Sequence, residues 1–342
     1  MRKLMIGDKL IGKLWDTVAR DGIGSLASPW QTRRQGRANA DARRDELLLL
    51  AQTEVDVADI KSGRKTFTED RKLIDLAQGN INTSLAELNH GRVEPYFTLE
   101  NLGANAELRS KATNMQEQIN LTKTVLYAEE ELENNNQEGS DQDVDPDWFV
   151  RWRDCAEKVS SEELQRLWAK ALAGEIVAPG TYSLRTLEFI KNISQSEAHE
   201  ISKLAPYVIK NMVYKVACID GAGMDFNYLL EMEDLGILSG VKGGGLEQTL
   251  SSIKDDCYER AIFHNNKLLL CKHENASKKA KLNCYKVTKL GCEVLRLGVF
   301  PMDELYLEQI GMQIKPQGFE VIFADWVQTS KEYGNFFNPR TL

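Results

Sequence analysis

Apolar residues recur at helical spacing through most of the first two thirds of the chain, most clearly between residues 145 and 208. Asp145 followed by Pro146 is typical of an N-cap and a first helical position. Ser160 with Glu163, and Ser194 with Glu197, have the spacing of capping boxes, in which each serine caps a helix and each glutamate bonds back to it. The pattern predicts a compact group of helices.

Two further positions predict where these helices end. Gly174 is expected to close its helix in the left-handed conformation, and Pro179-Gly180 to form a turn. We expect Trp152 and Trp168 to be buried against the helix that follows this turn. Six large apolar residues are expected to form a structural hub: Trp148, Trp152, Leu164, Trp168, Leu184 and Leu187.

Three stretches before the hub also have helical patterns. Residues 2–20 fit a basic amphipathic helix, which we expect to work as a contact element rather than as core. Helices are expected from Pro29 to about Ile60 and from Thr68 to His90. A long helix from Leu99 to about Leu132 has near-heptad spacing, which indicates a long helical hairpin or a coiled-coil segment, and self-association. The polar residues 134–145 indicate a linker.

After residue 207 the character changes to short strands and helices. A helix from Phe226 ends at Leu235-Gly236, strands flank the hairpin turn at His264–Asn266, and a strand at 282–287 precedes a short helix. This order is similar to that of winged-helix domains. The helix that would enter DNA carries Glu231, Glu233 and Asp234, which favours a protein contact over a nucleic-acid contact.

The predicted fold is therefore mainly α, with an N-terminal and central helical region followed by a C-terminal α+β winged-helix-like domain. The predicted parts are a long-helix region at 1–133, the linker at 134–145, a central helical domain at 146–207 and the winged-helix-like domain at 208–342. A length of 342 residues suffices for such a chain.

The net charge of −8 is unevenly distributed. Residues 1–44 contain ten basic and four acidic residues, a net charge of +6, so the remainder carries −14. A basic end on an acidic body is expected to meet an anionic surface or the body itself. Six basic and aromatic residues are the candidates for such a contact: Lys9, Lys13, Trp15, Arg33, Arg34 and Arg37.

The sequence shows no catalytic motif. Three cysteines and two histidines gather between residues 257 and 284, but without the close spacing of zinc ligands, so neither a metal nor another cofactor is assigned. None of the four histidines stands beside a nucleophile turn. No apolar run reaches the length of a membrane span and no signal peptide is present, so a cytoplasmic protein is expected.

One stretch carries a family resemblance. Residues 164–194, LQRLWAKALAGEIVAPGTYSLRTLEFIKNIS, resemble the signature of a bacterial family of uncharacterised proteins, and more distantly the abortive-infection alpha family of phage-resistance proteins. The resemblance implies a bacterial, host-defence context and supplies no catalytic residues.

These observations favour a non-enzymatic interaction protein, in phage defence, that acts by oligomerisation or at the membrane surface. Its expected partners are a second copy of itself, another protein, or an anionic membrane, which would put it at the inner membrane as a peripheral protein. A winged-helix DNA-binding regulator and a hydrolase of unrecognised type are the alternatives, and nucleic acid is the less favoured partner.

Overall fold

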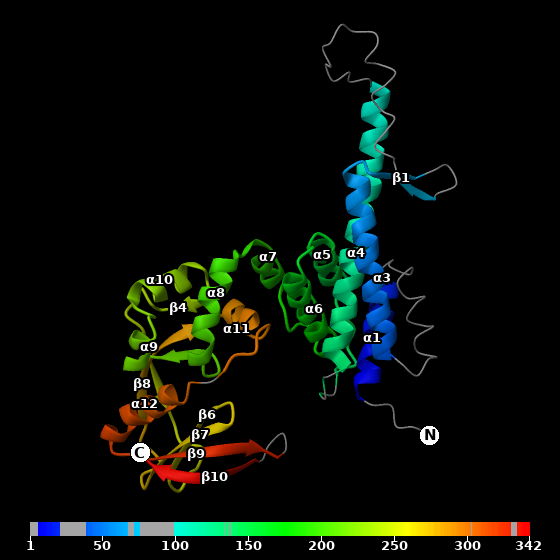
Figure 1. Ribbon diagram of the computed structural model, residues 1–342. Helices are drawn as coiled ribbons and strands as arrows, with labels where there is room; N and C mark the ends of the chain where they lie inside the picture. Colours follow the sequence, from blue (N-terminus) through cyan, green and yellow to red (C-terminus); the bar gives the residue numbers. More distant parts are fainter. Residues whose placement is uncertain are drawn as a thin grey trace, which may run out of the picture. The chain divides into compact units, whose positions relative to one another are not determined.

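The structure is a computed structural model (Figure 1) that describes residues 6–20, 39–67, 72–75, 99–133, 135, 137, 139–301, 303–329 and 334–342. The chain forms two compact units, Met1–Leu184 and Arg185–Leu342. This division is coarser than the four predicted parts, and its boundary lies inside the predicted central domain. Each unit is described by itself.

The first unit is built on one long helix, α4 (Leu99–Glu133), as the sequence predicts. Four described helices pack along it: α1 (Ile6–Arg20), α3 (Asn39–Lys61), α5 (Pro146–Ala156) and α6 (Glu162–Val177). Helices α3 and α4 run side by side and antiparallel (Figure 1), because Arg43 pairs with Glu133 while Glu54 pairs with Lys123. The predicted helical hairpin is therefore confirmed.

A small hairpin replaces the start of one predicted helix. Strands β1 (Lys65–Phe67) and β2 (Leu73–Asp75) pair antiparallel. The prediction of a helix from Thr68 is wrong for residues 72–75, and the rest of that prediction lies outside the described residues. The N-terminal part of the helix predicted from Pro29 also lies outside them.

The helix ends confirm some predictions and correct others. Asp145 caps α5 by accepting bonds from two backbone N–H groups. Helix α6 begins one residue later than predicted, because Ser161 and not Ser160 is its N-cap. Gly174 does not end α6. A Cβ there would lie 2.6 Å from Tyr182 Cε2, so this glycine allows the Tyr182 ring to pack closely against the helix. The turn at Pro179-Gly180 is present, with Gly180 at φ 84°.

Tryptophans fill the core of the first unit, as predicted. Trp152 and Trp168 are fully buried, and the Trp152 Nε1–H donates to the backbone oxygen of Trp168 at 2.9 Å. Trp148 is buried and donates to the backbone oxygen of Tyr182. The segment 134–145 is not a free linker in the residues described, since Val144 is buried and the Ser140 N–H donates to Val177.

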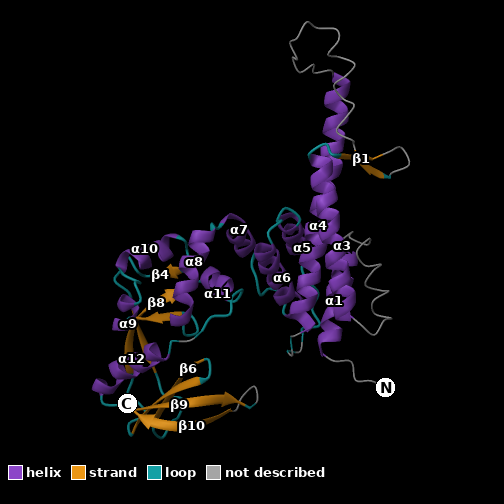
Figure 2. Cartoon of the chain, in the orientation of Figure 1, coloured by secondary structure: helices purple, strands orange, loops and turns teal. Residues whose placement is uncertain are grey.

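The second unit contains helices and antiparallel sheets (Figure 2). Its helices are α7 (Leu184–Asn192, which begins at the boundary residue), α8 (Gln195–Leu204), α9 (Ala217–Gly221), α10 (Phe226–Asp234), α11 (Lys289–Leu295) and α12 (Glu304–Ile314). The predicted capping box at Ser194 and Glu197 is confirmed on α8. Short 3₁₀ turns lie at Ala205–Tyr207 and Lys315–Gln317.

One sheet of this unit has the strand order β3 (Met212–Tyr214), β8 (Ala280–Val287), β4 (Leu238–Ser239), and β5 (Leu246–Leu250) also pairs with β8. The other has the order β10 (Gly334–Thr341), β9 (Glu320–Gln328), β7 (Lys267–His273), β6 (Tyr258–His264). Helix α12 packs against strands of both sheets, and its residues Tyr306 and Ile310 are fully buried.

The fold class is therefore mixed. Helices make up about 54% and strands 20%, with eleven α-helices among the described residues. The prediction of a mainly helical chain holds for the first unit, and the prediction of α+β structure holds for the second.

Candidate functional site

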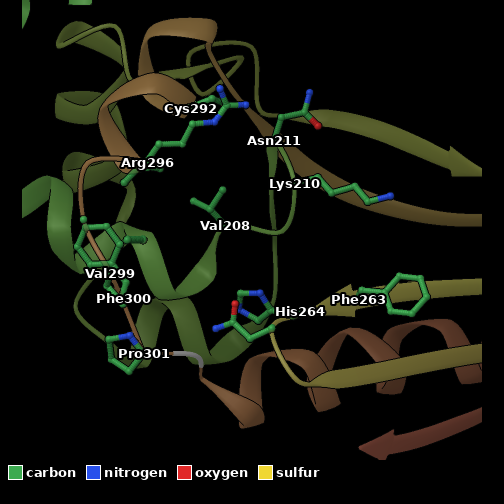
Figure 3. Close-up of a pocket in the computed structure, with 14 residues that line it drawn as sticks. Val208, Lys210, Asn211, Phe263, His264, Cys292, Arg296, Val299, Phe300 and Pro301 are labelled. Carbon is green, nitrogen blue, oxygen red and sulfur yellow. The ribbon is translucent and has the colours of Figure 1, made fainter. Parts of the chain in front are cut away.

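A concavity among the described residues of the second unit has a volume of about 700 Å³ (Figure 3). Three segments line it: residues 205–211 after α8, the hairpin turn at 263–265, and residues 292–301 from α11 into the following loop. This size falls in the range of roughly 300–1,000 Å³ that is usual for small-molecule sites.

A histidine holds two of these segments together. His264 Nε2–H donates to the backbone oxygen of Pro206 at 2.8 Å, and the ring packs edge-on against Tyr306. Burial lowers the pKa of His264 below its usual 6.5, so this histidine is neutral at physiological pH. The hairpin turn is thereby fixed against the segment after α8.

The segment after α8 contains an unusual turn. Ile209 and Met212 exchange backbone hydrogen bonds around Lys210 and Asn211. Lys210 has φ 58°, a left-handed conformation that is costly for a lysine and easy for glycine or asparagine. Turn geometry therefore gives no reason for a lysine here.

The lining combines apolar side chains with two cationic ones. Val208, Leu295 and Phe300 line it together with Lys210 and Arg296, and no aspartate or glutamate lines it. Neither cation forms an ion pair within the residues that the structure describes. The whole chain has more acidic than basic residues, 51 against 43. A concavity that is lined by Lys210 and Arg296 and by no carboxylate therefore differs in charge from the chain as a whole.

The same pocket contains a cysteine but no assembled nucleophile. Cys292 is half-buried, and burial raises the pKa of its thiol, which disfavours the reactive thiolate. In the described part of the chain, no hydrogen bond joins Cys292 to His264. The cysteines and histidines between residues 257 and 284 likewise do not gather as a metal site, since the described residues contain no cluster of three or more His, Cys, Asp or Glu side chains that could hold an ion.

The predicted contact residues of α1 make their contacts within the first unit. Trp15 and the other apolar residues of its face are buried in the first unit, so the prediction of a contact element rather than core is corrected. Lys13 Nζ donates to the backbone oxygens of Ser140, Gln142 and Ile176 at 2.6–2.9 Å. Lys9 pairs with Asp141 at 3.0 Å. Arg33, Arg34 and Arg37 lie outside the described residues.

The predicted hub is only partly assembled. Trp148, Trp152 and Trp168 lie together in the first unit, but Leu164 is 42% exposed and Leu184 is also exposed. Leu187 is buried and belongs to the second unit. The two exposed leucines lie near helix ends, where the periodic pattern does not distinguish a core position from a surface one.

A surface that we did not predict lies on α3. Leu48 is 60% and Val55 53% exposed, and Leu49, Ala51 and Ala58 are exposed beside them. The opposite face of the same helix packs Val57 and Ile60 against α4. Helix α3 is therefore apolar on two sides.

The comparisons with known proteins add one finding. Residues 104–214, from α4 through β3, match a family described as "Protein of unknown function (DUF2806)". Searches of curated proteins and of solved structures gave no match. No helix within the described residues is both long enough and apolar enough to cross a bilayer. The predicted resemblance to an uncharacterised family thus agrees with this match, which covers the stretch on which the prediction rested.

Proposed function

We propose that this protein is a non-enzymatic interaction protein that works through self-association of its helical unit. The observation that carries the proposal is the second apolar face of α3. Leu48, Ala51, Val55 and Ala58 follow the three-and-four spacing of a coiled-coil seam, and all four are exposed. A helix that is apolar on two sides usually has a partner on each.

The energetic balance indicates a reversible contact. A leucine or valine that goes from fully exposed to fully buried contributes about 1.5–3 kcal/mol. Leu48 and Val55 are 60% and 53% exposed, so burying both on each of two copies contributes about 3–7 kcal/mol. Lost translational and rotational freedom opposes association by about 4–15 kcal/mol. The two terms are of similar size, so we expect association that depends on protein concentration.

Sedimentation velocity over a concentration series tests this proposal. Wild-type protein is expected to shift towards a larger species as concentration rises. The double variant Leu48→Lys, Val55→Lys should remain monomeric, because burying two charges in the seam is costly. Thr113→Lys, at an exposed position of α4, adds a lysine away from the seam and serves as the control. A double variant that associates like wild type would reject the proposal.

A winged-helix role is the second candidate, and chain order supports it. Helix α8, strand β3, helices α9 and α10 and strand β4 come in the order of that fold. Strand β8 follows only after β5, β6 and β7, and it gives the strand order β3-β8-β4 that this fold also has. The exposed side of α10 carries Asp225, Glu231 and Asp234, so phosphate contacts are disfavoured there and we assign this helix to a protein contact. A gel shift with duplex DNA that weakens with salt would instead favour the DNA-binding regulator.

The cellular setting belongs to the same proposal. A role in phage defence rests on the sequence resemblance, and a cytoplasmic location is carried over from the hydropathy pattern of the sequence. A membrane-surface contact through α1 receives no support, because its apolar face is buried. A hydrolase function receives none either, because the described pocket has no activated nucleophile. Phage challenge of cells that express wild type or the Leu48→Lys, Val55→Lys variant tests whether self-association and protection go together.

A further inference from the structure

We infer that the pocket between residues 205–211, 263–265 and 292–301 binds a small molecule that has a phosphate group on an apolar body. This inference concerns the second unit and does not depend on self-association through α3. It rests on a lining that combines two cations with several apolar side chains.

The cations fit the charge of a phosphate monoester. Lys210 and Arg296 come from different segments and both line the pocket, and no carboxylate lines it (Figure 3). A phosphate monoester carries a charge of about −1.5 to −2 at neutral pH, which two cations balance. The guanidinium can bond two phosphate oxygens at once. The side-chain amides of Asn211 and Asn265 supply further N–H donors in the same lining.

The turn at Lys210 supports a binding role over a structural one. Its left-handed conformation would be easier for asparagine, which stands at the corresponding strained position of the other lining turn, Asn265 with φ 51°. Strained residues collect at functional sites. Arg296 supports a binding role less strongly than Lys210 does. It directly follows α11, and a cation next to a helix C-terminus is favourable without any ligand.

The apolar part of the lining fits the remainder of the ligand. Val208, Leu295, Phe300 and Pro301 line the pocket together with the cations. Val299, which also lines it, is 93% exposed, a large value for an isolated valine at the mouth of a pocket. A ligand with an aromatic or aliphatic body would cover these side chains while its phosphate contacts Lys210 and Arg296.

Phenyl phosphate is the minimal probe of this chemistry. We expect its titration into ¹⁵N-labelled full-length protein to move the amide signals of residues 208–211, 263–265 and 295–300. Benzyl alcohol, which lacks the charge, and inorganic phosphate, which lacks the apolar body, should each bind much more weakly. Equal binding of either one would overturn the proposed ligand class, and a titration with no localised shifts would overturn the site.

Three variants separate binding from folding. Lys210→Asn removes a cation while relaxing the turn, so it should leave the melting temperature unchanged or raised and weaken phenyl phosphate about tenfold to a hundredfold. Arg296→Gln should weaken it similarly. Lys279→Gln removes an exposed lysine outside the pocket and should have no effect. Unchanged affinity in both pocket variants would overturn the inference.

Discussion

Replacing Trp168 by alanine tests how the first unit is held together. Trp168 is 1% exposed, and its backbone oxygen accepts a hydrogen bond from the Trp152 indole. Removing a fully buried tryptophan side chain costs about 3–5 kcal/mol, because apolar contacts are lost and a cavity remains. This is a large part of the roughly 5–15 kcal/mol by which a domain is usually stable.

The expected change in melting temperature follows from the size of the unit. For roughly 150–250 residues, 1 kcal/mol corresponds to about 2–4 °C, so Trp168→Ala should lower the transition of this unit by about 6–20 °C. Tryptophan fluorescence reports this transition well, because Trp326 is the only one of the six tryptophans in the second unit.

Leu164→Ala is the matched control for this experiment. Leu164 lies on the same helix one turn earlier, but it is 42% exposed and should cost much less. Equal shifts for the two variants would show that burial of Trp168 is not what stabilises the unit, and the reasoning would fail.

Three further outcomes are expected from changes elsewhere. Lys13→Met should destabilise the first unit by about 1–3 kcal/mol, measured by urea unfolding, because three backbone oxygens lose their charged donor. Gly174→Ala should cost about 1–3 kcal/mol in the same assay, because the added methyl meets the Tyr182 ring; an unchanged midpoint would show that the ring moves aside freely. The lowered pKa of His264 means that the unfolded chain binds more protons than the folded one below about pH 6.5, so stability should fall as the pH drops through that value. His264→Gln should reduce this pH dependence in unfolding curves measured on either side of pH 6.5, and an unaltered dependence would assign it to other groups.

Local signals in the sequence predicted many elements correctly. The caps at Asp145 and Ser194, the end of α10 at Leu235-Gly236 and the hairpin turn after His264 each depend on neighbouring residues, so the sequence was sufficient. Helix α12 was missed although Asp303 caps it and Tyr306, Leu307 and Ile310 repeat at helical spacing. This cap and this spacing are local signals, and they are sufficient to predict the helix.

Other elements depend on contacts that local patterns do not contain. Leu73 and Ile74 suit a helical row, yet they pair with Lys65–Phe67 in a hairpin. Strand β10 contains a proline and an irregular register opposite β9, so its sequence lacks a strand signature. Pairing with a distant partner decides both cases.

The pocket also depends on contacts between distant segments, so the sequence could not predict it. Its cations, Lys210 and Arg296, are separated by more than eighty positions, and neither belongs to a charge cluster. The hydrogen bond between His264 and Pro206 brings the segments together, and this bond joins a side chain to a backbone atom. A search for clustered chemical groups finds neither.

The basic N-terminal end was predicted to meet an anionic surface or the acidic body, and the described residues of α1 favour the second. In the described part of this end, Lys9 and Arg20 of α1 pair with Asp141 and Asp143, and Lys13 bonds the backbone of the same loop. Ion pairs as exposed as those of Lys9 and Arg20 contribute little stability. They help to position α1, because all three cations contact residues 140–143 while the apolar face of the helix is buried. The predicted attraction between a basic end and an acidic body is therefore present within the first unit, and these three residues do not require an anionic membrane to explain their charge.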